Sequence, residues 1–437
     1  MNISPAKRIN GRLTMPGDKS ISHRAAMLAA VSEGVSRIAN YSTSQDCAAT
    51  LSCLQDLGVR IDRKGAEVLI HGAGRKGLRT PKSELDCGNS GTTMRLLAGI
   101  LAGQSFVSTL TGDESLRSRP MQRVAEPLGI MGAQVSSVAG RAPLTIEGRG
   151  SLTAIDYELL IASAQVKSCI LLAALNAKGK TTVTENEVTR DHTERMLKCF
   201  GVAVETGRKG EHARFATVNG PAELSARDLS IPGDVSSAAY FIAAAAMLPQ
   251  SSLEISNVGL NPTRVAFLRH LGTFGPIEVT NPREAANEPV GTIHVHGASR
   301  EQFRNESETP VKIEGLEIPQ LIDELPLLAV VGSQIHQGIE IRDARELRAK
   351  ESDRIAATVK NLRAMGAEVE EFEDGLRVSG RSKLRGTTID PHGDHRIAMA
   401  FSVAALIAEG GCEIKDAECV AVSFPEFFDL LDSVAER

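Results

Sequence analysis

Two cations lie close to the start of an apolar segment near the N-terminus. Residues 16–24 read PGDKSISHR, which places Lys19 at the first turn of an expected helix and Arg24 about one turn later. An anion bound there would meet both cations and the unpaired N–H groups of the helix start. The segment is not a Walker A motif, because Asp18 separates its glycine from its lysine. An ordinary capping turn is the alternative, and this segment alone does not decide between them.

Two acidic segments could transfer protons. Asp323 precedes the apolar run LPLLAVV, so its carboxylate either caps a buried helix or meets a substrate hydroxyl. The segment 348–354, RAKESDR, is expected to open an amphipathic helix that places Lys350 and Arg354 on one face beside Glu351. A carboxyl group between two cations can donate or accept a proton, although a solvated helix face would carry the same charges.

Two further patterns favour structure over chemistry. GAGRKG at 72–77 matches a dinucleotide-binding loop, but Pro81 follows where that fold requires a helix. The segment HGDHR at 392–396 could suggest a metal site, yet no second ligand cluster accompanies it and Arg396 would repel the cation. We interpret this segment as a capped helix start, and we expect neither a metal nor a cofactor.

The elements that must position these residues form an internal repeat. Apolar stretches of helix length begin near Ser20, Ser90, Ser163, Ser236, Asp323 and Asp394, at gaps of 70, 73, 73, 87 and 71 residues. Each stretch is apolar around most of its circumference, which is typical of a buried helix. A short β-branched strand and an amphipathic helix follow each stretch, and hairpin strands complete most units.

The repeat predicts two domains of three units each. The sixth unit ends at Arg437 after its second helix, and residues 1–14 contain no buried helix of their own. We therefore expect the N-terminus to complete the last unit. Similar turns, MPGDKS and IPGDVS, mark the two crossings between domains. The predicted domains are residues 1–14 plus 233–437, which hold repeats four to six, and residues 15–232, which hold repeats one to three.

Composition excludes several classes of function. The chain has 437 residues, a formal net charge of −5 and a pI of about 6.1, which argues against nucleic acid as a partner. No apolar run approaches the about 18 residues of a membrane span, and the N-terminus lacks the apolar core of a signal peptide. The seven cysteines are scattered and form no Cys-x-x-Cys pair. We expect a cytoplasmic protein with reduced cysteines that binds small molecules.

Eight segments together resemble the 5-enolpyruvylshikimate-3-phosphate synthase family. They are PGDKSISHR (16–24), GNSGTTMR (88–95), RP (119–120), SAQVKS (163–168), TRDHTE (189–194), IDELP (322–326), RAKESDR (348–354) and DHRIAM (394–399). They span nearly the whole chain in order, which makes the joint match far more specific than any single segment. The resemblance implies an α/β fold of two domains, each with three βαβαββ repeats around buried helices, and the sixfold repeat independently suggests the same.

The resemblance also implies a reaction and a set of site residues. The enolpyruvyl group of phosphoenolpyruvate would pass to the 5-hydroxyl of shikimate 3-phosphate by addition and elimination, in a monomer and without a cofactor. Shikimate 3-phosphate would meet Lys19, Ser20, Arg24, Ser163, Ala164, Gln165, Arg190, Asp323 and Lys350. Phosphoenolpyruvate would meet Lys19, Gly91, Arg119, Gln165, Arg354 and Arg396, with Asn89 and Thr92 supporting the Gly91 loop. Glu351 would be the acid, Asp323 the base and Lys19 an assisting cation, and the acid and base could be exchanged.

The sequence departs from one branch of that family. Leu96 lies where many members carry proline, Ala164 where they carry serine, and Val422 where they carry a lysine. These features look like the branch that includes glyphosate-tolerant members. Gly91, however, is the residue typical of sensitive enzymes, so the sequence leaves the response to this inhibitor open.

Two other functions are compatible with parts of the pattern. UDP-N-acetylglucosamine enolpyruvyl transferase shares the fold and phosphoenolpyruvate, but it usually carries a loop cysteine where this chain reads LTGDESLRSRP at 110–120. A catalytically silent protein could trap an anionic metabolite at the same helix starts. The pair Asp323 and Glu351 argues against silence, and release of phosphate would separate the two cases.

Overall fold

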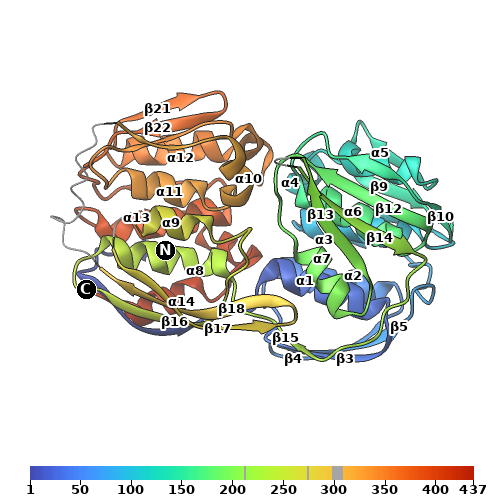
Figure 1. Ribbon diagram of the computed structural model, residues 1–437. Coiled ribbons are helices and arrows are strands. Elements are labelled where there is room, and N and C mark those ends of the chain that lie inside the picture. Colours follow the sequence, from blue (N-terminus) through green and yellow to red (C-terminus); the bar gives the residue numbers. More distant parts are fainter. Residues whose placement is uncertain (211–212, 273–274, 298–308) are drawn as a thin grey trace. The chain divides into compact units, whose positions relative to one another are not determined.

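The computed structural model describes residues 1–210, 213–272, 275–297 and 309–437, which fold into two compact units (Figure 1). Unit 1 contains Met1–Met15, Gly233–Arg283 and Pro289–Arg437. Unit 2 contains Pro16–Pro232 and also Glu284–Glu288, a short piece from the later part of the chain. The sequence analysis did not anticipate that piece.

In its described residues, unit 2 is built on three buried helices. They are α1 (Lys19–Ala30), α3 (Gly91–Ala102) and α6 (Ala164–Ala174). The helix α3 packs against both α1 and α6. The side chains of Asp18, Ser90 and Ser163 cap their first turns. Because small and apolar residues cover every face, each helix can be enclosed by protein. The prediction of buried helices is confirmed here.

The sheets of unit 2 repeat one pattern of pairing. In each, the strand after a buried helix pairs in parallel with a short strand and antiparallel with a hairpin strand. The first sheet orders β15 (Leu229–Ser230), β3 (Glu33–Ala39), β5 (Glu67–Ala73) and β4 (Arg60–Lys64); the second orders β6 (Leu85–Asp86), β7 (Val107–Thr111), β9 (Arg141–Glu147) and β8 (Gln134–Val138); the third orders β10 (Leu152–Thr153), β12 (Ala177–Glu185), β14 (Ala213–Gly220) and β13 (Val204–Lys209), with β11 (Asp156–Glu158) on β12. The last strand of the unit, β15, thus closes its first sheet.

Amphipathic helices cover the outer side of these repeats. They are α2 (Gln45–Asp56), α4 (Glu114–Ser118), α5 (Gln122–Ile130) and α7 (His192–Cys199). Ser44 caps α2 through the N–H group of Cys47, and Asp113 caps α4 through that of Leu116. The helix α7 packs against α1, which brings two segments far apart in the sequence together.

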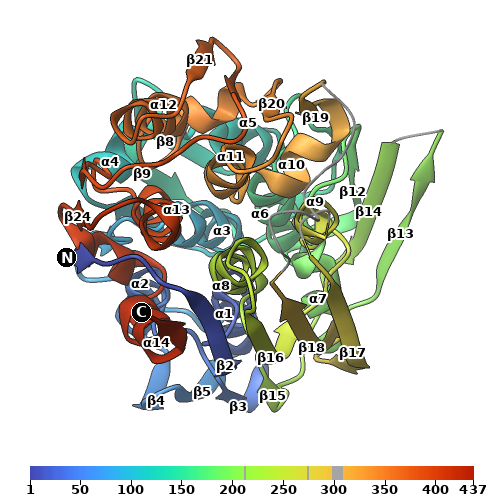
Figure 2. The same cartoon turned by 90° about the vertical axis from the view of Figure 1, so that its left-hand side faces the viewer.

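Unit 1 has the same plan in its described residues. Its buried helices are α8 (Val235–Met247), α11 (Leu325–Gly332) and α13 (His395–Ile407), which pack against one another, and Figure 2 looks nearly along their axes. The outer helices are α9 (Ala266–Leu271), α10 (Ile318–Leu321), α12 (Arg354–Ala364) and α14 (Phe427–Val434), with 3₁₀ turns at Gly315–Glu317, Arg345–Ala349 and Ala417–Val422. At 13 residues each, α8 and α13 are the longest apolar helices in the described ranges, and none there could cross a bilayer.

The N-terminal strands join two sheets of unit 1. The larger sheet orders β17 (Ile277–Ala285), β18 (Glu288–His296), β16 (Ser252–Gly259), β2 (Arg8–Thr14) and β25 (Ala435–Glu436); the others order β19 (Val311–Ile313), β20 (Ile339–Ile341), β22 (Gly375–Val378) and β21 (Val369–Phe372), and β1 (Asn2–Ile3), β24 (Cys412–Ile414) and β23 (Thr388–Ile389). β2 runs parallel to β16 of the fourth repeat, and β1 runs antiparallel to β24 of the sixth. The chain therefore begins within the same unit in which it ends.

Aromatic contacts fix the C-terminal helix on this core. The ring of Phe427 in α14 lies edge-on to Tyr240 and Phe241 of α8, at centroid distances of 5.9 and 5.7 Å. Such pairs contribute about 0.5 to 1.5 kcal/mol each beyond the area that they bury. All seven cysteines lie in described residues, where five of them are buried.

Candidate active site

Lys19 is the first residue of α1 in unit 2. Its ammonium nitrogen lies 2.8 Å from a carboxylate oxygen of Asp46, which belongs to the first turn of α2. Asp18 caps α1 by accepting a hydrogen bond of 2.9 Å from the N–H group of Ile21. The capping interpretation of this segment is therefore confirmed, and the same turn holds a mostly buried cation beside a helix N-terminus.

Arg24 is buried one turn further along α1. Its guanidinium donates to the carbonyl of Ser20 at 2.8 Å, to the hydroxyl of Ser168 at 2.8 Å and to that of Thr193 at 2.7 Å. The pKa of Arg24 is lowered to about 10, mainly by burial and in part by the charge of Arg190, against the opposing charge of Glu194. Three elements, α1, α6 and α7, thus hold this cation in one orientation.

A second cation lies at the start of α3. The guanidinium of Arg119 donates to the side-chain oxygen of Asn89 at 2.7 Å and to the hydroxyl of Ser115 at 3.1 Å. The amide nitrogen of Asn89 donates in turn to Asp113 at 2.7 Å. The loop before α3 is therefore fastened by side chains rather than left open to solvent.

Gly91 leaves room for two arginines. A β-carbon built on Gly91 would lie 2.8 Å from a guanidinium nitrogen of Arg95 and 3.4 Å from one of Arg119. Arg95 donates to the side-chain oxygen of Gln165 at 2.6 Å, and Gln165 donates to the hydroxyl of Thr92 at 2.9 Å. The start of α3 can thus offer two guanidinium groups and an amide to an anion.

Arg95 was missed by the sequence reasoning. It lies inside the quoted segment GNSGTTMR, and it is buried although it is charged. The available signal was its spacing, since a residue four positions after Gly91 lies on the same face of a helix.

The remaining residues predicted for unit 2 lie near α6 and before α7. Ser163 caps α6 by accepting from the N–H group of Val166, and Ala164 is the first residue of that helix. Arg190 is half-buried in the turn that precedes α7, close enough to Arg24 to affect its pKa. The charge of Arg190 therefore acts on Arg24, and Ser163 and Gln165 lie at the start of the adjoining helix.

In unit 1 a pair of buried arginines surrounds one carboxylate. Asp323 lies 3.4 Å from the guanidinium of Arg354 and 3.3 Å from that of Arg396. Arg354 is only 1% exposed, and it also contacts Asp394 at 2.8 Å and Glu351 at 2.6 Å. Burial alone would lower the pKa of Arg354, but the carboxylates of Asp394 and Glu351 raise it above its ordinary value.

The structure tests the interpretation of Asp323 as a helix cap. Glu324, not Asp323, is the N-cap residue of α11, and no side-chain capping bond is made there. The Asp323 carboxylate instead faces Arg354 and Arg396. The capping alternative for Asp323 is therefore wrong.

The prediction of a helix that opens over residues 348–354 is also wrong. A 3₁₀ turn ends at Ala349, and α12 begins only at Arg354, so Lys350 and Arg354 do not share a helical face. The reason is that Asp353 caps α12 by accepting from the N–H group of Ala356 at 3.0 Å. Lys350 and Glu351 consequently lie in a bend before the helix, from which Glu351 reaches Arg354.

The pKa of Lys350 is lowered. Its loss of hydration lowers its pKa to about 8, against the opposing effect of the Asp323 carboxylate, and the charge of Arg354 adds to the lowering. A lysine with this pKa can change its charge near neutral pH.

The segment 392–396 forms a helix start, as predicted. Asp394 caps α13 by accepting a hydrogen bond of 2.9 Å from the N–H group of Arg396. Within the described ranges, no group of three or more histidine, cysteine, aspartate or glutamate side chains is arranged to hold a metal ion.

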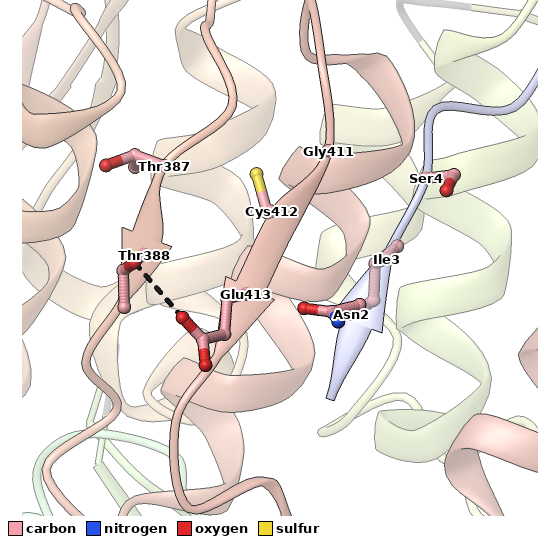
Figure 3. A pocket seen from close by; sticks show the side chains of 8 residues that line it. All are labelled: Asn2, Ile3, Ser4, Thr387, Thr388, Gly411, Cys412 and Glu413. Atoms are coloured by element: carbon pink, nitrogen blue, oxygen red, sulfur yellow. Dashed lines mark hydrogen bonds between the residues drawn. The ribbon is translucent and has the colours of Figure 1, made fainter.

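A surface groove of about 470 Å³ lies elsewhere in unit 1. It is lined by Asn2, Ile3, Ser4, Thr387, Thr388, Gly411, Cys412 and Glu413, and Figure 3 shows Glu413 hydrogen-bonded to Thr388 there. Because its single charged lining residue is an acid, this groove is unsuited to an anionic ligand. It shares no residue with the clusters described above.

Comparison with known proteins identifies the family. The family model described as EPSP synthase (3-phosphoshikimate 1-carboxyvinyltransferase) matches residues 3–431. The chain belongs to this family. The family predicted from the eight segments is thereby confirmed, and with it the enzyme class, 3-phosphoshikimate 1-carboxyvinyltransferase.

Several relatives match over the full length. A Koribacter versatilis (strain Ellin345) protein named 3-phosphoshikimate 1-carboxyvinyltransferase is 50% identical over 439 residues, covering 100% of this chain and 99% of its own. A protein of the same name from Geobacter sp. (strain M21) is 47% identical, again over 100% of this chain and 99% of its own. The EPSP synthase family match thus does not depend on one segment or one unit.

Solved structures confirm the predicted α/β fold class. EPSP synthase from Acinetobacter baumannii superimposes with a TM-score of 0.85 at 40% identity, over 99% of this chain and 98% of that one. The enolpyruvyl transferase NikO from Streptomyces tendae has a TM-score of 0.76 at 17% identity, over 99% and 96% of the two chains. The second likeness shows a shared fold and nothing further.

Proposed function

We propose that this protein transfers the enolpyruvyl group of phosphoenolpyruvate to the 5-hydroxyl of shikimate 3-phosphate and releases phosphate. The observation that carries the proposal is the cluster in which Arg354 contacts both Asp323 and Glu351. Two carboxylates on one buried cation suit a reaction that must move two protons. Membership of the EPSP synthase family supports the choice of both substrates.

The proposed contacts follow the charges of the substrates. Each phosphate carries about 1.5 to 2 negative charges and each substrate adds a carboxylate, so cations and helix N-termini are required. In unit 2 we assign Lys19, Ser20, Arg24, Ser163, Ala164, Gln165 and Arg190 to shikimate 3-phosphate, and Lys19, Asn89, Gly91, Thr92, Arg119 and Gln165 to phosphoenolpyruvate. In unit 1 we assign Asp323 and Lys350 to shikimate 3-phosphate, and Arg354 and Arg396 to phosphoenolpyruvate.

The reaction proceeds by addition and then elimination. Glu351 donates a proton to the methylene carbon of phosphoenolpyruvate, Asp323 takes the proton of the 5-hydroxyl, and the hydroxyl oxygen bonds to C2. In the second half the bond between C2 and the phosphate oxygen breaks, the Glu351 carboxylate takes a proton from the new methyl group to restore the enol ether, and Asp323 gives its proton to the leaving phosphate. Lys19 stabilises charge on the leaving phosphate. The reverse assignment of the two carboxyl groups is chemically equivalent, and neither uses a cofactor.

Three further proposals concern the state of the protein. We propose that it acts as a monomer, and that it lies in the cytoplasm, which its scattered, mostly buried cysteines support. We also propose residues 1–14 plus 233–437 and residues 15–232 as its folding domains. Light scattering at several concentrations tests the first of these, because a mass of two chains would refute the monomer.

The reaction proposal is tested by running the reaction in heavy water. Addition and elimination pass through a methyl group, so the methylene group of the product, or of recovered phosphoenolpyruvate, would contain deuterium. Mass spectrometry of the mixture with shikimate 3-phosphate would show a product that carries the enolpyruvyl group and the deuterium. A product without deuterium would reject the proposed mechanism, and the absence of any such product would reject the proposed function.

A further inference from the structure

A buried lysine links the segments that hold Arg24 and Arg190 in unit 2. Lys167 of α6 is 1% exposed, and its ammonium nitrogen lies 3.0 Å from Glu185 and 2.8 Å from Glu194. These two carboxylates raise the pKa of Lys167 although burial opposes them, so the lysine is charged. One cation therefore joins the end of β12 to the first turn of α7.

Glu185 connects this lysine to the Arg190 turn. One oxygen of Glu185 accepts from Lys167, and the other accepts from the N–H group of Thr189 at 3.2 Å and from its hydroxyl at 2.5 Å. Thr189 is buried and directly precedes Arg190. The backbone from which Arg190 projects is thus fixed by a carboxylate whose other oxygen is held by Lys167.

Glu194 connects the same lysine to Arg24. Its charge acts on the Arg24 guanidinium, whose pKa it raises against the effect of burial. The preceding residue, Thr193, accepts a hydrogen bond from Arg24 and donates one of 2.6 Å to Ser168, the neighbour of Lys167. Lys167 therefore shares the charge of Glu194 with Arg24.

We propose that Lys167 is a positioning residue that holds Arg24 and Arg190 in place to bind shikimate 3-phosphate, an anion. This inference rests on the proposed function, because it concerns the same substrate. The positive charge of Arg190 acts on Arg24, and an anion that both arginines bind would offset this repulsion. Lys167 fixes the two carboxylates behind them, so that neither acid is left to draw an arginine away from the ligand.

Loss of the Lys167 charge has a specific consequence. Glu185 and Glu194 would then be buried carboxylates without their cation, and burial already raises the pKa of Glu185. Arg24, which is near Glu194, is the cation available to replace Lys167. Recruitment of Arg24 would weaken the binding of shikimate 3-phosphate while leaving the start of α3 unchanged.

Lys167→Met tests this inference, with Lys198→Met as the matched control on the exposed side of α7. We expect Lys167→Met to raise both the KM and the directly titrated Kd for shikimate 3-phosphate by about tenfold or more, with the KM for phosphoenolpyruvate within about twofold. Thr189→Val removes only the hydroxyl bond to Glu185, and we expect a rise of several-fold in the same Kd. Lys198→Met should match the wild type.

The possible outcomes are distinct. A Lys167→Met protein with a lower melting temperature and a wild-type Kd for shikimate 3-phosphate would make Lys167 purely structural and overturn the inference. Equal rises in both KM values would overturn it as well, since they would indicate general damage to unit 2. If Lys167→Met does not fold, an unchanged Kd in Thr189→Val overturns it. A wild-type protein that neither binds nor converts shikimate 3-phosphate would instead reject the proposed function itself.

Discussion

Arg354 donates a hydrogen bond of 2.6 Å to Glu351, which places a carboxylate on a guanidinium that is almost fully buried. The same guanidinium reaches Asp323.

We predict that Glu351→Gln and Asp323→Asn each lower kcat by about 10²-fold or more, because each removes one proton transfer but keeps the shape of the side chain. The KM values should stay within about tenfold. Glu409→Gln, on the surface of unit 1, is the control. Steady-state phosphate release measures all three, and wild-type rates in either site variant would refute the assigned roles.

Asp394 should account for part of the acid sensitivity of unit 1. Burial would raise the pKa of Asp394, but contact with Arg354 lowers it below its ordinary value. A carboxyl group with a lowered pKa stabilises the fold above the pKa of an unfolded aspartate, about 3.9, and loses that effect as the pH falls through the lower folded value.

We therefore predict that Asp394→Asn lowers the free energy of unfolding by about 3 kcal/mol or more at pH 7. The difference from the wild type should shrink as the pH falls below about 4. Asp432→Asn, which loses only an exposed ion pair with Arg437, should cost less than about 1 kcal/mol. Urea unfolding over a pH series measures both variants. A difference that did not depend on pH would contradict the role given to the ion pair.

Lys350 should make substrate binding sensitive to mildly alkaline pH. With a pKa of about 8 in the unliganded protein, Lys350 loses its charge as the pH rises above that value. We expect the KM for shikimate 3-phosphate to rise above about pH 8 in the wild type, by up to about tenfold per pH unit. Lys350→Arg keeps its charge over this range, so its KM should stay flat. Parallel pH profiles of the two proteins would contradict this prediction.

Gly91 should be sensitive to the addition of one methyl group. An alanine there would place its β-carbon 2.8 Å from Arg95 and 3.4 Å from Arg119, so a guanidinium must move. We predict that Gly91→Ala raises the KM for phosphoenolpyruvate by about fivefold or more, with that for shikimate 3-phosphate within about twofold. Gly129→Ala is the matched control, because its β-carbon would meet nothing within 4 Å in α5. Equal KM values for wild type and Gly91→Ala would show that this close approach has no role in binding.

Local signals in the sequence predicted much of this structure. The buried helices α1 and α13 are apolar around most of their circumference and begin at a capping aspartate, so composition and one capping residue were enough to place them. The same pattern predicted that the polar candidate residues lie at the N-termini of these helices. The eight family segments then supplied the assignment of roles.

Long-range contacts explain what the sequence could not predict. The start of α12 depends on Asp353, and the preceding turn is held by a bond from Ser352 to Asp394, 42 residues away in the chain. Glu288 lies in unit 2, where its carboxylate accepts a hydrogen bond of 2.7 Å from the buried ring of His192. Sequence periodicity also cannot predict the pairing of Lys167 with Glu185 and Glu194, because only the folded chain brings these charges together.

The most direct test is phosphate release by the purified, chelator-treated protein with phosphoenolpyruvate and either shikimate 3-phosphate or UDP-N-acetylglucosamine as the acceptor. We predict release with shikimate 3-phosphate alone, which would establish the reaction and the acceptor together. Release only with the nucleotide sugar would contradict the assigned acceptor, and no release with either acceptor would contradict the claim that the protein is a working enolpyruvyl transferase.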